Sequence, residues 1–214
     1  MTRKVLLFEL TLIAAACVVG VAAFPHLPNR IPIHWNVHLR PNRYGPKWVI
    51  FLLGPGMMAG VTLFTSLGPW LSPKRFEVDN FRSTWRQLML MVFCLIGYIY
   101  AAMLWADFHH RVDAGRMILG GASLMVVLMG NLMGKVRKNF FIGVRTPWTL
   151  ASDRTWNATH RFAARTWMAG GLFGLLFTVI WLPVLSISSL LAGVLAPYVY
   201  SLVVYKRQEE HEQV

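Results

Sequence analysis

The stretch QLMLMVFCLIGYIYAAMLWA, at Gln87–Ala106, decides the fold class of this 214-residue chain. It contains no Asp, Glu, Lys, Arg or His. A helix rises 1.5 Å per residue, so about 20 such residues cross the roughly 30 Å hydrocarbon core of a bilayer. Backbone groups in hydrocarbon need partners within the same segment, which a helix supplies and an isolated strand does not. The stretch therefore predicts a transmembrane helix.

Five further stretches have comparable length and apolar content. They are Val5–Phe24, Trp48–Leu71, Met117–Gly134, Trp167–Leu185 and Ile187–Tyr205. Within these stretches only Glu9 is charged, and charged residues make up 14% of the chain against about 25% in soluble domains. We predict an all-α integral membrane protein with six transmembrane helices. The first stretch leaves a second interpretation open, a cleaved signal peptide, because Arg3 and Lys4 precede it and small residues close it.

The distribution of basic residues predicts the orientation. If the N-terminus is cytoplasmic, 15 of the 21 Lys and Arg residues fall on the cytoplasmic side and six on the other. Positive residues are enriched in cytoplasmic loops, so both termini are predicted to be cytoplasmic. The same residues flank the apolar stretches, where they meet anionic lipid headgroups. We therefore expect the net charge of +12 to interact with membrane lipid, and we expect no direct contact with nucleic acid.

Small residues in the apolar stretches predict close helix packing. The pairs Gly56/Gly60, Gly130/Gly134 and Gly170/Gly174 have the G-x-x-x-G spacing that lets two backbones approach. We expect one of these pairs to form a helix crossing. Pro55 and Pro197 should kink their helices or lie near helix ends.

The loop at Pro25–Lys47 is too patterned for a plain tether. Its prolines forbid a continuous helix. Ile31, Ile33, Trp35 and Val37 alternate with polar or proline positions, which predicts a short, half-buried strand. We expect a structured extracytoplasmic loop that folds over the outer ends of the helices.

Histidines in and near this loop raise the question of a metal. His34 and His38 have metal-ligand spacing only in a helix, which the prolines oppose. His26, His109 and His110 fall on the same side of the membrane, but nothing in the sequence brings them together. We predict no metal and no cofactor.

The loop at Lys135–Thr166 carries a second set of local signals. Gly143 permits a tight bend, and Pro147 drives Thr146 into an extended conformation. Ser152 and Asp153 are typical of a helix start. From there an amphipathic cytoplasmic helix is predicted to lie in the headgroup region and run into the fifth span. One face carries Trp156, His160, Ala163 and Trp167, and the opposite face carries Arg154, Arg161 and Arg165. This helix either only anchors the span or also docks a partner.

These loops resemble a known family. GNLMGKVRKNFFIGVRTPWTLASDRTWNATHRFAARTW, at Gly130–Trp167, resembles the signature of the SdpI-type immunity proteins. NRIPIHWNVHLRPNRYGPK, at Asn29–Lys47, is similar to the module that often precedes it. The resemblance implies an N-terminal module at 1–71, with its loop at 25–47, and a four-span region at 72–214, with the motif loop at 130–167.

The resemblance also supplies candidate binding residues. On the cytoplasmic side they are Asn131, Asn139, Gly143, Arg145, Thr146, Pro147, Trp148, Thr149, Trp156, Thr159 and His160. On the extracytoplasmic side they are Pro32, His34, Trp35, Asn36, Tyr44 and Lys47. The chain departs from the family pattern at Leu39, Ala163 and Ala164, where glycine is usual. The turn geometry at Leu39 is therefore expected to differ.

The family role implied for this chain is protection of a bacterium, from its cytoplasmic membrane, against a secreted membrane-active peptide toxin. A further implied role is that of a receptor that holds a transcriptional repressor at the membrane. The partners would then be the toxin outside and the repressor inside.

Two other classes of function remain. Charges within the membrane often mark transport pathways, and Glu9 favours a small transporter or channel. A membrane enzyme is disfavoured because H-E-x-x-H, G-x-S-x-G and P-loop patterns are missing from the sequence. Cys17 and Cys94 lie in apolar runs, and no nucleophile accompanies Asp153 and His160. We predict no catalytic residue.

Overall fold

The computed structural model describes residues 3–72, 78–109 and 112–212, and six helical segments in it are long and apolar enough to cross a membrane. Five spans are the helices α1 (Arg3–Ala23), α4 (Arg82–Phe108), α5 (Ala114–Met133), α7 (Asp153–Val179) and α8 (Pro183–Glu212). The second span is composite and consists of α2 (Val49–Phe51), η2 (Leu52–Gly56) and α3 (Met57–Leu71). Short η1 (Phe24–His26), η4 (Val78–Phe81) and α6 (Pro147–Ala151) connect them. The prediction of a mostly helical, six-span membrane protein is confirmed. Lys74, Arg75, His110 and Arg111, used in the sequence arguments, lie outside the described residues.

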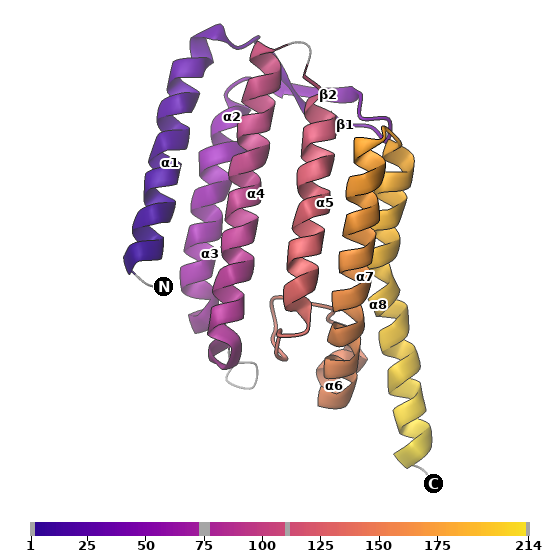
Figure 1. The fold of residues 1–214 in the computed structure, drawn as a ribbon. Coiled ribbons are helices and arrows are strands. Elements are labelled where there is room, and N and C mark those ends of the chain that lie inside the picture. The colour runs from indigo at the N-terminus through magenta and orange to yellow at the C-terminus, as the bar shows by residue number, and fades with distance from the viewer. Residues whose placement is uncertain (1–2, 73–77, 110–111, 213–214) are drawn as a thin grey trace.

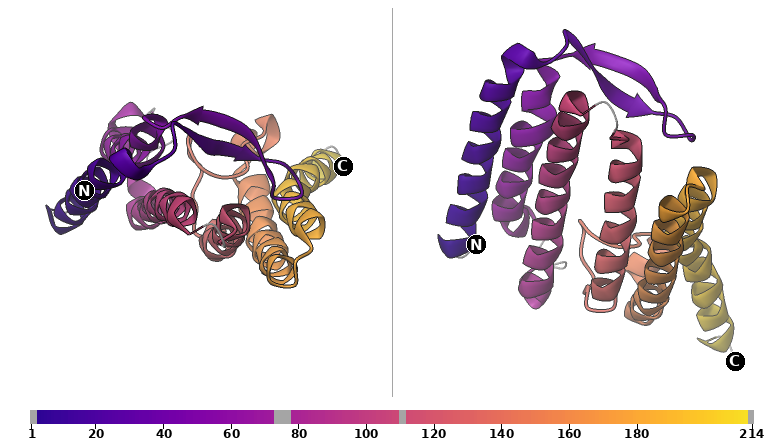
Figure 2. Two further views of the ribbon diagram at one scale, coloured as in Figure 1. Left: turned by 90° about the horizontal axis from the view of Figure 1, so that it is seen from above. Right: turned by 45° about the horizontal axis from the view of Figure 1, so that its top comes forward.

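The helices stand side by side in a curved row that follows the chain from α1 to α8 (Figures 1 and 2). Both termini lie at one end of the bundle, with α6 and the loop that joins α5 to α7. The strands β1 (Arg30–Trp35) and β2 (Pro41–Pro46) form an antiparallel hairpin across the other end. We refer to these as the motif end and the hairpin end. The expected strand is present, but it stops at Trp35, and Val37 lies in the exposed turn that follows.

Small residues bring α7 and α8 together. A Cβ on Gly170 would lie 2.7 Å from the carbonyl oxygen of Ser189, and one on Gly193 would lie 2.5 Å from that of Thr166. Gly174 faces Leu190 of α8 at 3.0 Å. By contrast, nothing lies within 4 Å of a Cβ built on Gly60 or Gly134. The expectation that one G-x-x-x-G pair forms a crossing is therefore confirmed for Gly170/Gly174.

The second span is interrupted where Pro55 was expected to kink it. Pro55 lies inside the π-helical turn η2, where the wider turn accommodates a residue without an N–H. The Tyr100 ring of α4 fills the space beside Gly54, since a Cβ there would lie 2.2 Å from the ring. The Tyr100 hydroxyl also donates to the Ala16 carbonyl at 2.8 Å. Tyr100 therefore joins α1, η2 and α4.

The predicted boundary between the last two spans was wrong. The sequence placed it at residue 186, whereas α7 ends at Val179 and α8 begins at Pro183. The turn depends on a tertiary contact: Arg116 of α5 donates to the Val179 carbonyl at 2.6 Å and lies 4.7 Å from the centre of the Trp181 ring. Trp181 adopts a φ of 64°. Because residues 180–182 are apolar, composition alone does not mark this turn.

The helix expected in the headgroup region begins as predicted but runs differently. Ser152 caps it by accepting from the Thr155 amide. This helix is the N-terminal part of α7, which runs along the bundle and not across its axis (Figure 1). Its predicted apolar face is covered by protein, because Trp156, His160 and Ala163 are all buried. Arg154, Arg161 and Arg165 are exposed. The interfacial helix is therefore corrected to the first turns of a spanning helix.

Candidate functional site

The loop between α5 and α7 is shaped by one fully buried side chain, Asn139. Its Oδ1 accepts from the amides of Phe141 and Ile142 at 2.8 and 2.7 Å. Its Nδ2 donates to the carbonyls of Arg137 and Ile142 at 2.8 and 3.0 Å. An asparagine amide has two donors and an oxygen that accepts twice, so this side chain is fully satisfied by the backbone around it. Asn139 folds the loop and is not available to an outside partner.

His160 holds the next part of the loop. Its Nε2 accepts from the Val144 amide at 3.1 Å, so the ring carries its proton on Nδ1, which donates to the Trp156 carbonyl at 2.8 Å. The Trp156 ring stacks on the imidazole at 4.0 Å between centroids, and its Nε1 donates to the Val136 carbonyl at 2.9 Å. Gly143 has a φ of 105°, and a Cβ there would lie 2.2 Å from His160 Nε2. The bend predicted at Gly143 is therefore confirmed.

The short helix α6 closes the loop. Thr146 is extended and forms a reciprocal capping box with Thr149, and Pro147 occupies the first turn. The Thr149 hydroxyl donates to the Val144 carbonyl at 2.9 Å. The Arg145 guanidinium donates to the Phe140 carbonyl, while the residue itself stays exposed.

The loop is also bonded to α8, a contact that the sequence did not indicate. Trp148 Nε1 donates to the Ser201 hydroxyl at 2.5 Å. The hydroxyls of Ser152 and Thr155 both donate to Gln208 Oε1 at 3.0 Å. Short polar residues on a helix carry no spacing signal that would reveal such partners.

The structure thus brings the candidate residues of the motif end together, but two of them, Asn131 and Thr159, make none of the hydrogen bonds described above. Asn131 is exposed on α5, outside the loop. Thr159 is fully buried, and its hydroxyl makes no hydrogen bond among the described residues. The remaining candidates hold the loop in shape, and two of them, Arg145 and Pro147, are exposed together with neighbouring residues of this end. Among these are the cations Lys135, Arg137, Arg154, Arg161 and Arg165.

A polar cavity of about 430 Å³ opens beside these cations and is lined by Asn80, Arg137, Lys138, Asp153, Trp156 and Asn157. Lys138 and Asp153 form an ion pair across it. The amides of Asn80 and Asn157 and the charge of Arg137 suit an acidic or polar partner.

Aromatic contacts join the first half of the chain to the motif loop. Phe64 of α3 and Trp85 of α4 lie 5.5 and 5.7 Å from Phe141 between ring centroids. The Trp85 Nε1 donates to the Thr65 carbonyl at 3.3 Å. The second span therefore contacts the motif loop directly.

At the hairpin end, Asn36 forms the turn between the strands. Its Oδ1 accepts from the amides of His38 and Arg40, each at 3.0 Å. Leu39 has a φ of 61°, the left-handed region that glycine favours. The departure at Leu39 therefore places a leucine in a glycine-like conformation.

The other candidates of the hairpin divide between anchoring and exposure. Lys47 Nζ donates to the Phe24 carbonyl at 3.2 Å and lies over the Phe24 ring, which fastens the hairpin to the end of α1. His34 shares a 2.6 Å hydrogen bond with Asn42, and Tyr44 is exposed. Pro32 and Trp35 face a cavity above α4 and α5. Among the described residues, no three His, Cys, Asp or Glu side chains are grouped as metal ligands.

Glu9, the charged residue of the first span, is 1% exposed inside the bundle. Among the described residues it forms no ion pair with Arg3 or Lys4, and its Oε2 has no hydrogen-bond partner.

Comparison with known proteins identifies two matching regions of the chain. Residues 135–204 match the SdpI/YfhL protein family, and residues 11–59 match a domain of unknown function, DUF1648. The chain is therefore a multi-pass membrane protein that carries the SdpI-family region preceded by this N-terminal module, and the resemblance drawn from the motifs is confirmed. It is 22% identical to the Immunity protein SdpI of Bacillus subtilis (strain 168) over 166 residues, which are 77% of each chain. No solved structure matches the chain.

Proposed function

We propose that this chain is a bacterial membrane immunity protein that protects its cell against a secreted membrane-active peptide toxin. The observation that carries the proposal is the similarity to an immunity protein over 77% of the chain. The name of the matched family does not refer to an enzyme, and the proposal includes no catalytic step. It keeps the division into an N-terminal module, residues 1–71, and a four-span region, residues 72–214.

Protection is tested by expressing the chain in a sensitive bacterium and counting survivors during exposure to secreted membrane-active peptide toxins. We expect survival to rise against at least one toxin relative to the empty vector. Killing that is unchanged for every toxin, with the chain present at normal abundance in the membrane fraction, would refute the proposal.

The orientation is part of the proposal: the hairpin end faces outward and the motif end faces the cytoplasm of a bacterial cytoplasmic membrane. It is supported by the 15 basic residues that would then lie inside. Asn42 on the hairpin and Asn157 on α7 are both exposed. In a Cys17→Ser, Cys94→Ser background, a membrane-impermeant thiol reagent added to intact cells should label Asn42→Cys and spare Asn157→Cys. Labelling of both, or of Asn157→Cys alone, would overturn the orientation.

The proposal extends to the receptor role that the resemblance implies, and the two ordered ends support it. The exposed cations and the polar cavity of the motif end would hold an acidic surface of a cytoplasmic transcriptional repressor while the hairpin end engages toxin. A repressor encoded beside the gene should then sediment with membranes only when both chain and toxin are present. Sedimentation that is independent of either component would remove the receptor role and leave protection untouched.

Glu9 favours a second candidate function, a small transporter or channel, since a buried carboxyl within a membrane often lies on a solute or proton pathway. This candidate predicts solute uptake by proteoliposomes that carry the purified chain, and loss of that uptake in Glu9→Gln. Protection of cells by Glu9→Gln at the wild-type level would favour immunity without transport.

A further inference from the structure

The two faces of the hairpin differ in burial. Ile31 is 1% exposed and packs in a core formed with α1, α2 and α4, so its face of β1 lies on the helices. Side chains alternate between the two faces of a strand, and Arg30 and His34, on the opposite face of β1, are exposed. We refer to that opposite face, which also carries the exposed side chains of residues 42–44, as the outer face of the hairpin.

An irregularity in strand pairing gathers side chains on the outer face. Pro32 pairs with Tyr44 and His34 pairs with Arg43, so two alternate residues of β1 lie opposite two consecutive residues of β2. The extra residue of β1, Ile33, makes a β-bulge, and bulges change the direction in which nearby side chains point. Four residues line one open depression of about 520 Å³ on the hairpin: Arg30, Asn42, Arg43 and Tyr44.

The depression presents hydrogen-bond donors. Arg43 has no hydrogen-bond or ion-pair partner among the described residues. Arg30 uses one N–H on the Tyr44 carbonyl at 3.0 Å, which holds its guanidinium across the two strands. Asn42 Oδ1 accepts from His34 Nδ1 at 2.6 Å, so Asn42 Nδ2 remains a donor. Since a guanidinium has five N–H donors and no acceptor, the depression suits a ligand with several acceptor oxygens.

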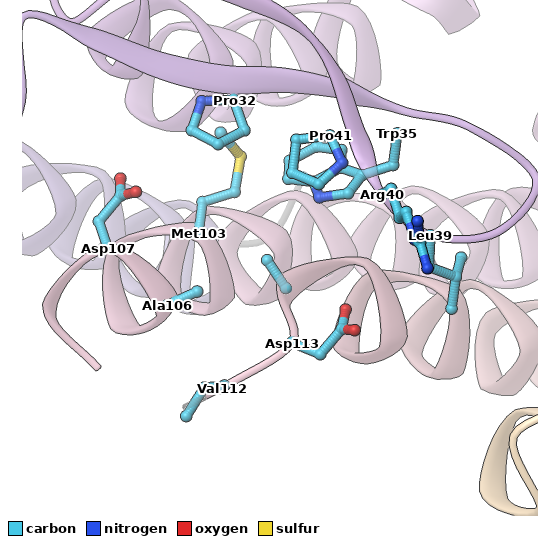
Figure 3. Close-up of a pocket in the computed structure, with 11 residues that line it drawn as sticks. Pro32, Trp35, Leu39, Arg40, Pro41, Met103, Ala106, Asp107, Val112 and Asp113 are labelled. Atoms are coloured by element: carbon cyan, nitrogen blue, oxygen red, sulfur yellow. The ribbon is translucent and has the colours of Figure 1, made fainter. Parts of the chain in front are cut away.

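The charge of the outer face is positive. The hairpin segment, residues 24–48, contains four Lys and Arg residues and no Asp or Glu. The nearby acids, Asp107 and Asp113, lie beneath the hairpin, where they line a cavity of about 440 Å³ together with Arg40 (Figure 3). Asp113 accepts from the Arg116 amide, and Asp107 also has an interaction within the chain. Neither acid lines the outer depression, so its positive charge attracts anions from the aqueous phase.

The direction of the outer face favours a ligand from the aqueous phase over a lipid. The exposed rings of Trp48 and Trp105, near the ends of the second span and of α4, are typical of a membrane interface. Lipid headgroups surround the helix ends at that level. The outer face of the hairpin is turned away from the helices, because Ile31 on the other face packs against them.

We propose that the outer face of the hairpin binds the carboxylates of an acidic peptide segment, with Arg30 and Arg43 as the cations and Asn42 and Tyr44 as uncharged donors. The proposal rests on the proposed function, because it names the part of a secreted peptide that the chain recognises. Guanidinium and carboxylate groups form charge-assisted, often paired, hydrogen bonds. Complementary charges at exposed positions chiefly raise the rate of association, so this surface captures the peptide on the aqueous side of the bilayer.

The test measures binding of a soluble acidic peptide to the full chain in nanodiscs of zwitterionic phosphatidylcholine. The probe is a dye-labelled peptide of alternating serine and glutamate with blocked ends, and two comparison probes carry glutamine or lysine in place of glutamate. Fluorescence anisotropy gives the Kd, with empty nanodiscs as the baseline. The glutamate peptide should bind, and its Kd should rise several-fold between about 20 and about 200 mM salt because the charges are exposed. The glutamine and lysine peptides should not bind.

Arg43→Gln and Arg40→Gln form a matched pair, since each removes one exposed charge from the hairpin. Arg43→Gln should raise the Kd of the glutamate peptide about fivefold, as expected when one charge-assisted contact is lost. Arg40→Gln should change that Kd by less than about twofold, because Arg40 lines the inner cavity and not the outer depression. Arg30→Gln should act as Arg43→Gln does. Because Arg43 has no described partner, the Tm of Arg43→Gln should equal that of the wild type.

Three results would overturn the proposal: no binding of the glutamate peptide, equal binding of the glutamine peptide, or equal loss of binding in Arg40→Gln and Arg43→Gln. Polyphosphate of equal charge that displaces the peptide at a far lower concentration would also overturn it, because the outer face would then be a phosphate site. The binding assay contains no cells, so its outcome is separate from that of the immunity assay. Cells that die although the glutamate peptide binds would reject the proposed function and keep the peptide-binding surface. Cells that survive although the peptide fails to bind would do the reverse.

Discussion

Gly143 provides the sharpest test of how the motif loop is built, because one added methyl group meets two separate obstacles there. The backbone φ of 105° is a conformation that L side chains rarely adopt. The new Cβ would also lie 2.2 Å from His160 Nε2, the atom that accepts from the Val144 amide. Gly143→Ala should therefore strain the backbone and break a buried hydrogen bond.

The cost can be estimated from its two parts. A left-handed conformation in a non-glycine residue costs about 1–2 kcal/mol, and a buried amide that loses its acceptor costs about 1–3 kcal/mol. The free energy of unfolding should thus fall by roughly 2–5 kcal/mol if the strain and the lost bond add. For a chain of this size that corresponds to a decrease in Tm of about 4–20 °C.

The assay is thermal unfolding of the purified chain in detergent, followed by circular dichroism. Gly134→Ala is the matched control, because it lies at the same end of the bundle, has a helical φ of −64° and would place its Cβ with no atom within 4 Å. A Gly143→Ala protein as stable as Gly134→Ala would refute the account. A His160→Ala background separates the two parts of this cost. In that background Gly143→Ala should lower the free energy of unfolding only by the backbone strain. If the losses of the two single variants simply added in the double variant, the two residues would not be in contact.

Three further predictions concern the loop and the helix crossing. Asn139→Ala removes four hydrogen bonds and should lower the free energy of unfolding by about 2–4 kcal/mol, whereas Asn131→Ala, at an exposed position, should be neutral in the same thermal assay. Gly193→Val should separate α7 from α8 and lower Tm by several degrees, whereas Gly60→Val, which meets no neighbour, should do so only slightly; equal losses would argue against the crossing. Arg145→Ala and Trp148→Ala should each reduce survival in the toxin assay while membrane abundance, read by immunoblot, stays within about twofold of wild type; full protection at equal abundance would remove these residues from the site.

The six spans were predictable because hydrocarbon imposes a long apolar run on each, and such runs are visible in the sequence. Local backbone features were predictable for a similar reason: the conformations at Gly143, Thr146 and Ser152 depend on the residue and its immediate neighbours. The turn between α7 and α8 was misplaced because a cation on α5 fixes it, and residues 180–182 are as apolar as the helices they join.

Burial of an apolar helix face cannot be assigned from periodicity alone. The face with Trp156 and His160 predicted contact with lipid headgroups, yet the motif loop covers it. Lipid and protein both bury apolar surface, so one helical pattern serves both environments. Strand β2 was missed because PNRYGP lacks the alternation of buried and exposed positions that predicts a strand, and pairing with β1 alone defines it.

The structure changes what the motif residues can be expected to do. Sequence reasoning treated Asn139, Thr149, Trp156 and His160 as candidate binding residues, but their polar atoms are bonded to the chain's own backbone. A partner that binds at this end would therefore contact the exposed cations. Substitution of a buried motif residue would alter binding by changing the shape of the loop. Since Phe141 of that loop contacts Phe64 of α3, the same loop shape also depends on the second span. Damage to either half of the chain should therefore appear at the motif end.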